Sequence, residues 1–275
     1  MAADPDDLRL LGVDFSSAPR RGKPIVAAWG RWLRQGALLE LVQFDEIARL
    51  SDFTAWLQAP GPWRGAFDLP FGLPRELVQA LGWPTDWPAL MDHYAALDRR
   101  TIAATFAAFC AARPVGGKFA HRACDLPAGS SPSMKWVNPP VAFMLHAGVP
   151  ALRAAGVDLP GLQTGDPARV ALEGYPGLVA RALIGRRSYK SDTRANQTAD
   201  RLIARKDLVD ALEQGRWQGL RLKLTHAQRD GLVGDAQGDR LDAALCLLQS
   251  GWAGGRPRFG WPAGADPLEG WILGA

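Results

Sequence analysis

Four strand-like segments fall within the first 70 residues of this 275-residue chain, and one helix-like segment separates the third from the fourth. Apolar residues dominate the strand-like segments, and the turn-forming Gly36 lies between the second and the third. Apolar residues recur at helical spacing in the helix-like segment, and Pro70 interrupts the backbone after the fourth strand. The strands are expected at residues 8–14, 24–33, 37–44 and 63–68, and the helix at residues 45–59. This order, β-β-β-α-β, predicts an α/β fold that begins with an antiparallel three-strand meander.

Residues 72–165 are less regular and are interpreted as an insertion after the fourth strand. A helix is expected at residues 93–112, followed by a long loop rich in Gly, Pro and Ser and by further helix. Long loops in compact domains are usually functional or disordered. A fifth strand is expected at residues 168–177, and helices at residues 177–185, 198–215 and 238–251. We therefore expect a single domain over residues 1–275, with a mainly helical and loop insertion at about 72–165.

Composition limits the classes of protein that fit these elements. The chain is 47% hydrophobic and 22% charged, as expected for a globular protein with a sizeable core, and it contains no long uncharged apolar run. Its three cysteines are not in CxxC pairs, which argues against a disulfide scaffold or a zinc site. The acidic start of the chain lacks the basic and apolar regions of a secretory signal. We therefore expect a cytoplasmic protein with no membrane partner.

Acidic residues lie at or next to the ends of three predicted strands: Asp14, Asp68 and Glu173. Asp239 and Asp242 are three residues apart in the last predicted helix, so both can lie on one of its faces. Carboxylates brought together repel one another unless a cation neutralises them, and oxygen ligands suit Mg²⁺ or Mn²⁺. Structural interpretations also exist: Asp68 as a turn former, Asp239 as a helix N-cap and Glu173 as the partner of a nearby arginine.

Four short motifs occur in order along the chain: GVDFSS at residues 12–17, FDLPFGLP at 67–74, LEGYPG at 172–177 and DRLDAALC at 239–246. As an ordered set they resemble the motifs of domain-of-unknown-function family 429, whose members are regarded as predicted ribonuclease H-like nucleases. The resemblance spans about residues 10–250. It implies a ribonuclease H-like fold, a mixed five-stranded sheet with helices on both faces, and the β-β-β-α-β order is consistent with that topology.

The resemblance also implies roles for individual residues. Asp14 is the first-strand metal ligand, Asp68 is the second carboxylate, and Asp242 is the ligand from the helix. Asp239 and Asp242 have a DxxD spacing similar to that of RuvC-type junction resolvases, and Glu173 lies in a motif typical of the family. The implied catalytic set is Asp14, Asp68, Glu173 and Asp242, and the implied metal set is Asp14, Asp68, Asp239 and Asp242.

Several other residues fit a role in substrate binding. Lys190 could balance the charge of a phosphate, although the basic residues near it could instead pair with neighbouring acidic ones. Substrate contacts are also expected from the insertion, at Arg122, Lys135, Trp136 and Asn138. The last three combine a cation, a ring for stacking and an amide, which suits a base or a sugar, but Trp136 could equally pack the insertion onto the sheet.

The leading hypothesis is a Mg²⁺- or Mn²⁺-dependent nuclease, a phosphodiesterase that acts on nucleic acid or a nucleotide. The net charge of only +4 argues against a long duplex as substrate. One alternative is an actin-like or sugar-kinase-like phosphotransferase that would cradle ATP in the turn at residues 14–22, and another is a non-catalytic binding protein of the same fold. The insertion could also be the contact of a homodimer rather than a cover over substrate.

Overall fold

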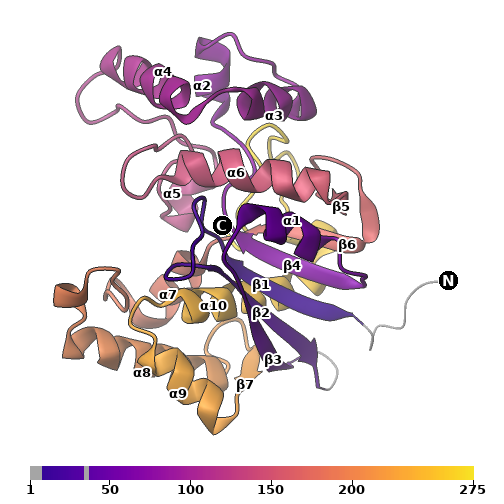
Figure 1. Cartoon of the computed structure of the whole chain (residues 1–275), viewed down its shortest axis with the longest axis vertical. Coiled ribbons are helices and arrows are strands. Elements are labelled where there is room, and N and C mark those ends of the chain that lie inside the picture. The colour runs from indigo at the N-terminus through magenta and orange to yellow at the C-terminus, as the bar shows by residue number, and fades with distance from the viewer. Residues whose placement is uncertain (1–7, 34–36) are drawn as a thin grey trace.

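The computed structural model describes residues 8–33 and 37–275, so the turn expected at Gly36 lies outside the described residues. Seven strands form one sheet in the order β5-β6-β4-β1-β2-β3-β7 (Figure 1). Their bounds are β1 (Arg9–Asp14), β2 (Ile25–Trp32), β3 (Leu38–Ile47), β4 (Trp63–Asp68), β5 (Val157–Asp158), β6 (Asp166–Gly174) and β7 (Arg221–Lys223). β2 pairs antiparallel with β1 and β3, and all other pairings are parallel, so the carboxyl ends of β1, β4 and β6 lie at the same edge of the sheet.

The expectation of an α/β protein is confirmed, whereas the expectation of a five-stranded sheet is wrong. The five predicted strands form its centre, β3-β2-β1-β4-β6, and β5 and β7 extend it at the two edges. β5 has two residues and β7 has three, which is too short for a recognisable alternation of apolar and polar side chains.

Helices cover both faces of the sheet, as expected. On one face, α10 (Asp239–Gly254) contacts β1, β2 and β4 and is packed against α7 (Pro176–Ile184) and α9 (His226–Gly234), with α8 (Ala199–Glu213) beyond them. On the other face, α1 (Leu50–Leu57) packs against α6 (Val141–Ala154), which also contacts α3 (Trp87–Ala96). The remaining helices of the insertion are α2 (Arg75–Ala80), α4 (Arg99–Ala111) and α5 (Asp125–Ala128). Within the described ranges, none of the helices combines the length and the apolar character needed to cross a membrane.

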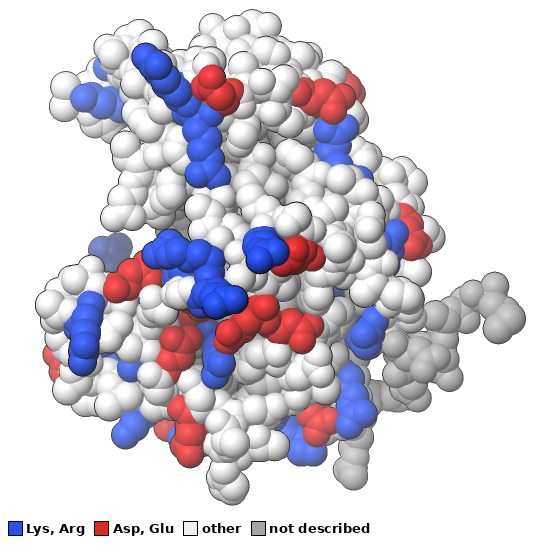
Figure 2. All heavy atoms as spheres, in the orientation of Figure 1, with Lys and Arg blue, Asp and Glu red and all other residues white. Residues whose placement is uncertain are grey.

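Alternation along β1 divides the apolar side chains between two cores. Leu10 belongs to the core on the side of α10, whereas Leu11 and Val13 belong to the core on the side of α1 and the insertion. The insertion and the pair α7–α8 stand on either side of a hollow, which Figure 2 shows at the left of the molecule. The carboxyl-terminal edge of the sheet therefore lies between two layers of helices.

α10 lies so close to β1 that position 12 requires glycine. A Cβ atom on Gly12 would lie 2.1 Å from the carbonyl oxygen of Ala243 and 2.1 Å from the nitrogen of Leu247. A larger residue would push the helix away from the strand. This contact places the first turn of α10 over the carboxyl end of β1.

Two predicted helices differ from the observed ones. The helix expected at residues 93–112 is two helices, because the side chain of Asp98 caps α4 by accepting a hydrogen bond from the nitrogen of Thr101 at 2.7 Å. The helix expected at residues 45–59 begins only at Leu50, because β3 continues to Ile47, which pairs with Ile25 of β2.

Candidate functional site

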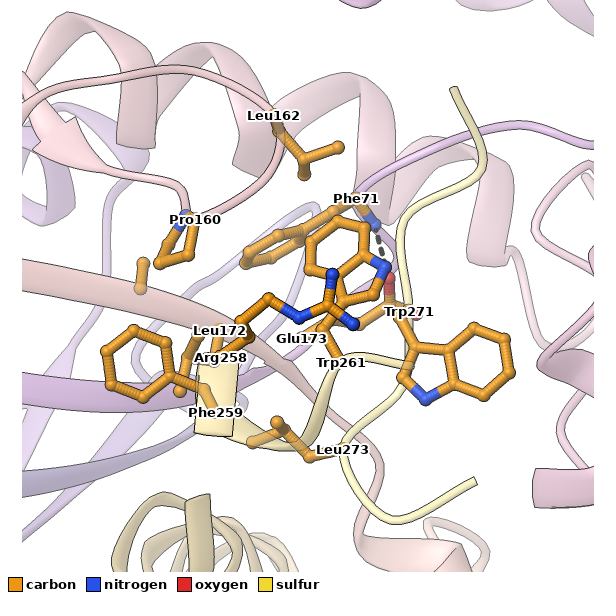
Figure 3. A pocket seen from close by; sticks show the side chains of 11 residues that line it. Phe71, Pro160, Leu162, Leu172, Glu173, Arg258, Phe259, Trp261, Trp271 and Leu273 are labelled. Carbon is orange, nitrogen blue, oxygen red and sulfur yellow. Dashed lines mark hydrogen bonds between the residues drawn. The ribbon is translucent and has the colours of Figure 1, made fainter. Parts of the chain in front are cut away.

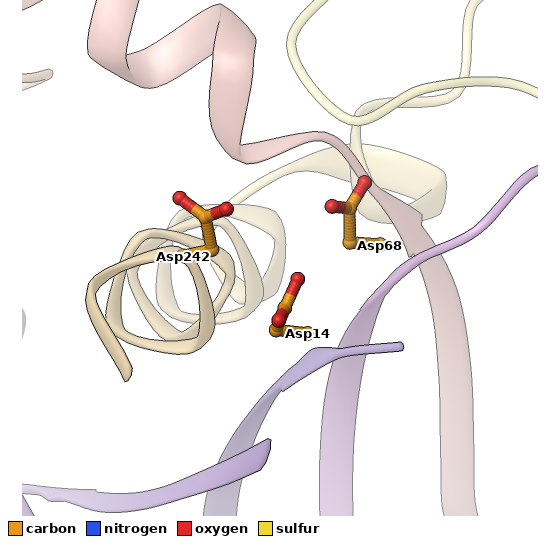
Figure 4. Close-up of side chains that lie close together, drawn as sticks. All are labelled: Asp14, Asp68 and Asp242. Carbon is orange, nitrogen blue, oxygen red and sulfur yellow. The ribbon is translucent and has the colours of Figure 1, made fainter. Parts of the chain in front are cut away.

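Asp14 and Asp68 are the last residues of two neighbouring parallel strands, β1 and β4. They are paired in the register of these strands, so their side chains leave the sheet side by side on the face that α10 covers. Asp242 lies in the first turn of α10 and points toward the other two aspartates (Figure 4). One carboxylate oxygen of each residue lies within 4.8 Å of those of the other two. We call these three residues the aspartate centre.

Burial and mutual repulsion act together on the aspartate centre. Asp242 is fully buried, and Asp14 and Asp68 are partly buried. Burial, followed by the charge of Asp242, raises the pKa of Asp68 to about 7 and holds the pKa of Asp14 well above its usual range. Within residues 8–33 and 37–275, no side chain donates a hydrogen bond to the carboxylates of Asp14 and Asp68. Each of these carboxyl groups that ionises therefore adds negative charge that a bound cation would neutralise.

Two consecutive residues that precede α8 contact Asp242. The ammonium of Lys190 forms an ion pair with one oxygen of Asp242, and the hydroxyl of Tyr189 donates a hydrogen bond to the other. Burial lowers the pKa of Lys190, but the charges of Asp242 and its neighbours outweigh burial and hold this pKa well above its usual range. The side chain of Lys190 is nevertheless 41% exposed, so it can leave Asp242 without breaking a packed core.

Asp239 lies outside the aspartate centre. Its carboxylate accepts a hydrogen bond from the ammonium of Lys23 at 2.7 Å, and Lys23 also pairs with Asp192 at 2.7 Å. The N-cap of α10 is Gly238, so the N-cap interpretation of Asp239 is wrong. In this structure the ammonium of Lys23 neutralises the carboxylate of Asp239. The role of Asp239 as a metal ligand stays a prediction.

Glu173 points to the opposite face of the sheet. Gly174 is the residue in register with Asp68, and Glu173 is in register with Phe67, so alternation turns the Glu173 side chain away from α10. There its two oxygens accept hydrogen bonds from Arg122 at 2.7 and 2.8 Å, and the nitrogen of Phe71 donates to it at 2.9 Å. This pairing matches the structural interpretation of Glu173, and its catalytic role stays a prediction.

Arg122 uses all its N–H donors inside the protein. Its guanidinium donates to Glu173, to Asp125 at 2.9 and 3.1 Å, and to the carbonyl oxygen of Glu269 at 3.0 Å. Arg122, Asp125 and Glu173 are all buried. These contacts connect the insertion and the C-terminal segment to β6. They give Arg122 a structural role and leave none of its N–H donors free for a substrate, and its predicted contact with a substrate stays a prediction.

A small enclosed cavity lies beside Glu173. It measures about 10 Å³, close to the space of one water molecule, and its walls include Phe71, Trp261 and Trp271 (Figure 3). The indole nitrogen of Trp271 is buried there without a hydrogen-bond partner among the described residues. The size of this cavity excludes a substrate.

A larger cleft of about 280 Å³ opens beside the aspartate centre. Asp68, Lys190, Glu173 and Arg122 contribute to its lining. Its other walls come from the residues that follow β4, from the insertion, from the start of α7 and from the C-terminal segment; they include Leu69, Pro70, Ser130, Ser131, Pro139, Val141, Met144, Tyr175 and Ile272. We call this space the cleft. The insertion therefore contributes a wall next to the aspartates.

The other predicted substrate-binding residues lie outside the lining of the cleft. Trp136 packs against Phe119, with ring centroids 5.7 Å apart, and belongs to the edge of the core that joins the insertion to the sheet. Lys135 is partly buried and Asn138 is exposed. The packing interpretation of Trp136 is the one that this geometry supports, and substrate contacts of Lys135 and Asn138 stay predictions.

Sequence reasoning missed three contributors to the site: Tyr189, Lys23 and Asp125. Tyr189 is adjacent to Lys190, so its position on a polar segment was a usable signal. Lys23 reaches Asp239 only through a tertiary contact across 216 residues, which no local spacing in the sequence indicates. Asp125 lies three residues after Arg122, so the spacing of this pair was a usable signal.

The fold and the site define an α/β protein with a centre of three aspartates that could hold a metal ion. A family model described as "Protein of unknown function (DUF429)" matches residues 12–261, and the chain belongs to this family. Comparison with curated proteins and with solved structures gives no match.

Replacing Arg122 by methionine should destabilise the fold strongly. The change leaves Asp125 and Glu173 buried without a compensating charge, and breaking such a buried pair costs about 3–5 kcal/mol in the free energy of unfolding. The matched control is Arg187→Met, because Arg187 pairs with Asp207 at the surface and such pairs contribute at most about 1 kcal/mol. Urea unfolding measures both variants. Equal losses in the two variants would contradict the structural role of Arg122.

Metal-free stability should fall as the pH rises from about 4 to about 8. The raised pKa values of Asp14 and Asp68 mean that the folded state binds more protons than the unfolded state across this range, so stability present at low pH is lost as each group ionises. Urea unfolding in the presence of EDTA measures the effect. The Asp68→Asn variant should show a weaker pH dependence, and an unchanged dependence would contradict the raised pKa of Asp68.

Proposed function

We propose that this chain is a divalent-metal-dependent phosphodiesterase of ribonuclease H-like fold that acts on nucleic acid or a nucleotide. The observation that carries the proposal is the convergence of Asp14, Asp68 and Asp242 within 4.8 Å. Like-charged carboxylates placed together raise the free energy of the folded state unless a cation joins them. A protein that only needed a stable sheet edge would gain nothing from this arrangement.

The arrangement of the sheet supports the fold part of the proposal. The five central strands, β3-β2-β1-β4-β6, form a mixed sheet with helices on both faces. Asp14, Asp68 and Asp242 come from the first strand, the fourth strand and the last helix, which are the positions that the family resemblance implies for the carboxylates.

The donor set fits Mg²⁺ or Mn²⁺, because all three donors are carboxylate oxygens and two of them belong to side chains without a hydrogen-bonding partner in the described ranges. Asp14, Asp68 and Asp242 would hold the ion. When bound, such an ion polarises a phosphate and activates water for phosphodiester hydrolysis. Asp68 must lose its proton first, so metal affinity should rise with pH around its pKa of about 7.

Lys190 and Tyr189 have separate tasks in this proposal. Lys190 is half-exposed and lines the cleft, where its ammonium can neutralise a phosphate once Asp242 is bound to a metal ion. Tyr189 is buried and holds Asp242 in position by donating a hydrogen bond to it. Lys190 would therefore neutralise the charge of the substrate, and the neighbouring Tyr189 orients Asp242.

The proposal predicts that Mn²⁺ stabilises the wild type and supports its hydrolysis of a labelled oligonucleotide. Asp14→Asn and Asp242→Asn should lose the Mn²⁺-dependent rise in Tm and at least about 100-fold in hydrolysis rate. Since each substitution also changes metal-free stability, each Tm is compared with and without Mn²⁺. Asp230→Asn, a change at an exposed residue of α9, is the matched control and should behave as the wild type.

Two outcomes would contradict the proposal. A Tm that responds to Mn²⁺ equally in wild type and Asp14→Asn would place the ion elsewhere. A metal response confined to the wild type, with ATP hydrolysed and no oligonucleotide cleaved, would favour the phosphotransferase alternative.

A further inference from the structure

A second hollow of about 560 Å³ lies next to the cleft. Three segments line both: residues 129–130, 175–177 and 189–190 each contribute one residue to the cleft and one to this second hollow. The two spaces therefore lie side by side. Asp68 and Lys190 line the cleft, and α7 lines the second hollow.

The ring of Tyr175 lies at the border between the two spaces. Tyr175 lines the cleft, and its hydroxyl lies 3.4 Å from the carbonyl oxygen of Gly129, which lines the second hollow. A Cβ atom on Gly177, also in the second hollow, would lie 2.6 Å from the Tyr175 hydroxyl oxygen. The aromatic ring of Tyr175 therefore lies where a ligand that occupies both spaces would pass between them.

The second hollow is lined by three arginines, and we call it the basic groove. Arg181 donates to the carbonyl oxygens of Ala128 at 2.7 Å and Gly129 at 2.8 Å, and Arg187 pairs with Asp207 at 2.6 Å. Arg186 is exposed and forms no ion pair within residues 8–33 and 37–275. The groove therefore holds two anchored guanidinium groups and one that is available to an anion.

The cleft has different chemistry from the basic groove. Its walls are mainly apolar, with Leu69, Val141 and Met144 among them, and two serines contribute hydroxyl groups. At about 280 Å³ it lies near the lower end of the range of roughly 300–1,000 Å³ for small-molecule sites, which suits one flat ring system with a few polar atoms. An apolar cleft, an aromatic ring and a basic groove in sequence match the alternation of base and phosphate in a polynucleotide.

We propose that the substrate is an unpaired nucleic-acid strand, with one base in the cleft and the adjoining phosphates in the basic groove. This inference rests on the proposed function, because Asp68 and Lys190 line the same cleft that would hold the base and would act on the phosphate attached to its sugar. The base must be unstacked and unpaired to enter the cleft, because a space of about 280 Å³ admits one ring system and not a base pair. A duplex presents its phosphates outside and its bases inside, so it can use the groove but not the cleft.

Fluorescence anisotropy in EDTA tests this inference separately from catalysis. The probe is a fluorescein-labelled oligothymidylate of about 12 nucleotides, compared with the same strand annealed to its complement. The single strand should bind at least about tenfold more tightly than the duplex at equal salt. Arg186→Ala should weaken single-strand binding about threefold to tenfold and lower the salt dependence by about one ion. Arg194→Ala, an exposed arginine outside both spaces, is the matched control and should bind as the wild type.

A second variant tests the cleft. Ser131→Trp should fill the cleft and weaken single-strand binding, while the Mn²⁺-dependent rise in Tm stays as in the wild type and shows that the variant is folded. Tighter binding of the duplex, equal losses in Arg186→Ala and Arg194→Ala, or no binding of either probe would overturn the inference. Preferred binding of the single strand, without cleavage of it in Mn²⁺, would uphold the binding site and overturn the proposed function instead.

Discussion

Repulsion among three carboxylates is the interaction on which the account of this site depends. Asp14 and Asp68 cannot avoid each other, because they are paired residues at the ends of parallel strands. Asp242 cannot avoid them either, because the glycine at position 12 lets α10 approach β1 closely and brings its first turn over the strand end. Backbone geometry therefore holds the charges together, and burial, followed by the charge of Asp242, raises the pKa values of Asp14 and Asp68.

The negative charges on the two faces of the sheet are compensated in different ways. On the insertion side, Arg122 compensates Glu173 and Asp125 with a full set of hydrogen bonds, which makes that face a permanent structural joint. On the α10 side, the cation that the described residues supply to the aspartate centre is Lys190, which is half-exposed and forms an ion pair with Asp242. The hydrogen-bonded network of Arg122 and the aspartate centre therefore lie on opposite faces of the same strands. The aspartate centre is the one that is open to a ligand.

Much of the fold follows from local sequence patterns, and the site follows in part. The positions of Asp14, Asp68 and Asp242 at or near the ends of their elements could be predicted from the sequence, because strand and helix periodicities are local. The face of the sheet toward which Glu173 points could not be predicted. It depends on whether β6 aligns Gly174 or Glu173 with Asp68, and a register shift of one residue moves each side chain to the opposite face. Arg122 and Trp136 looked like substrate contacts for a related reason: loop residues give no periodic signal to say whether a charge or a ring is buried.

The edge strands show the same limit. β5 and β7 are held by pairing with longer neighbours and have no pattern of their own. Tertiary contacts decide such strands, and single-sequence patterns do not contain them. The helix break at Asp98 differs, because its cap on Thr101 is a local contact and an aspartate at a helix start is a signal that the sequence contains.

Anomalous diffraction from crystals of the full chain grown with Mn²⁺ tests the central claim most directly. A manganese peak in contact with oxygens of Asp14, Asp68 and Asp242, with the ammonium of Lys190 withdrawn from Asp242, is the predicted result. A peak elsewhere, or none, with Lys190 still paired to Asp242, would contradict the claim that these three aspartates are placed to hold a metal ion.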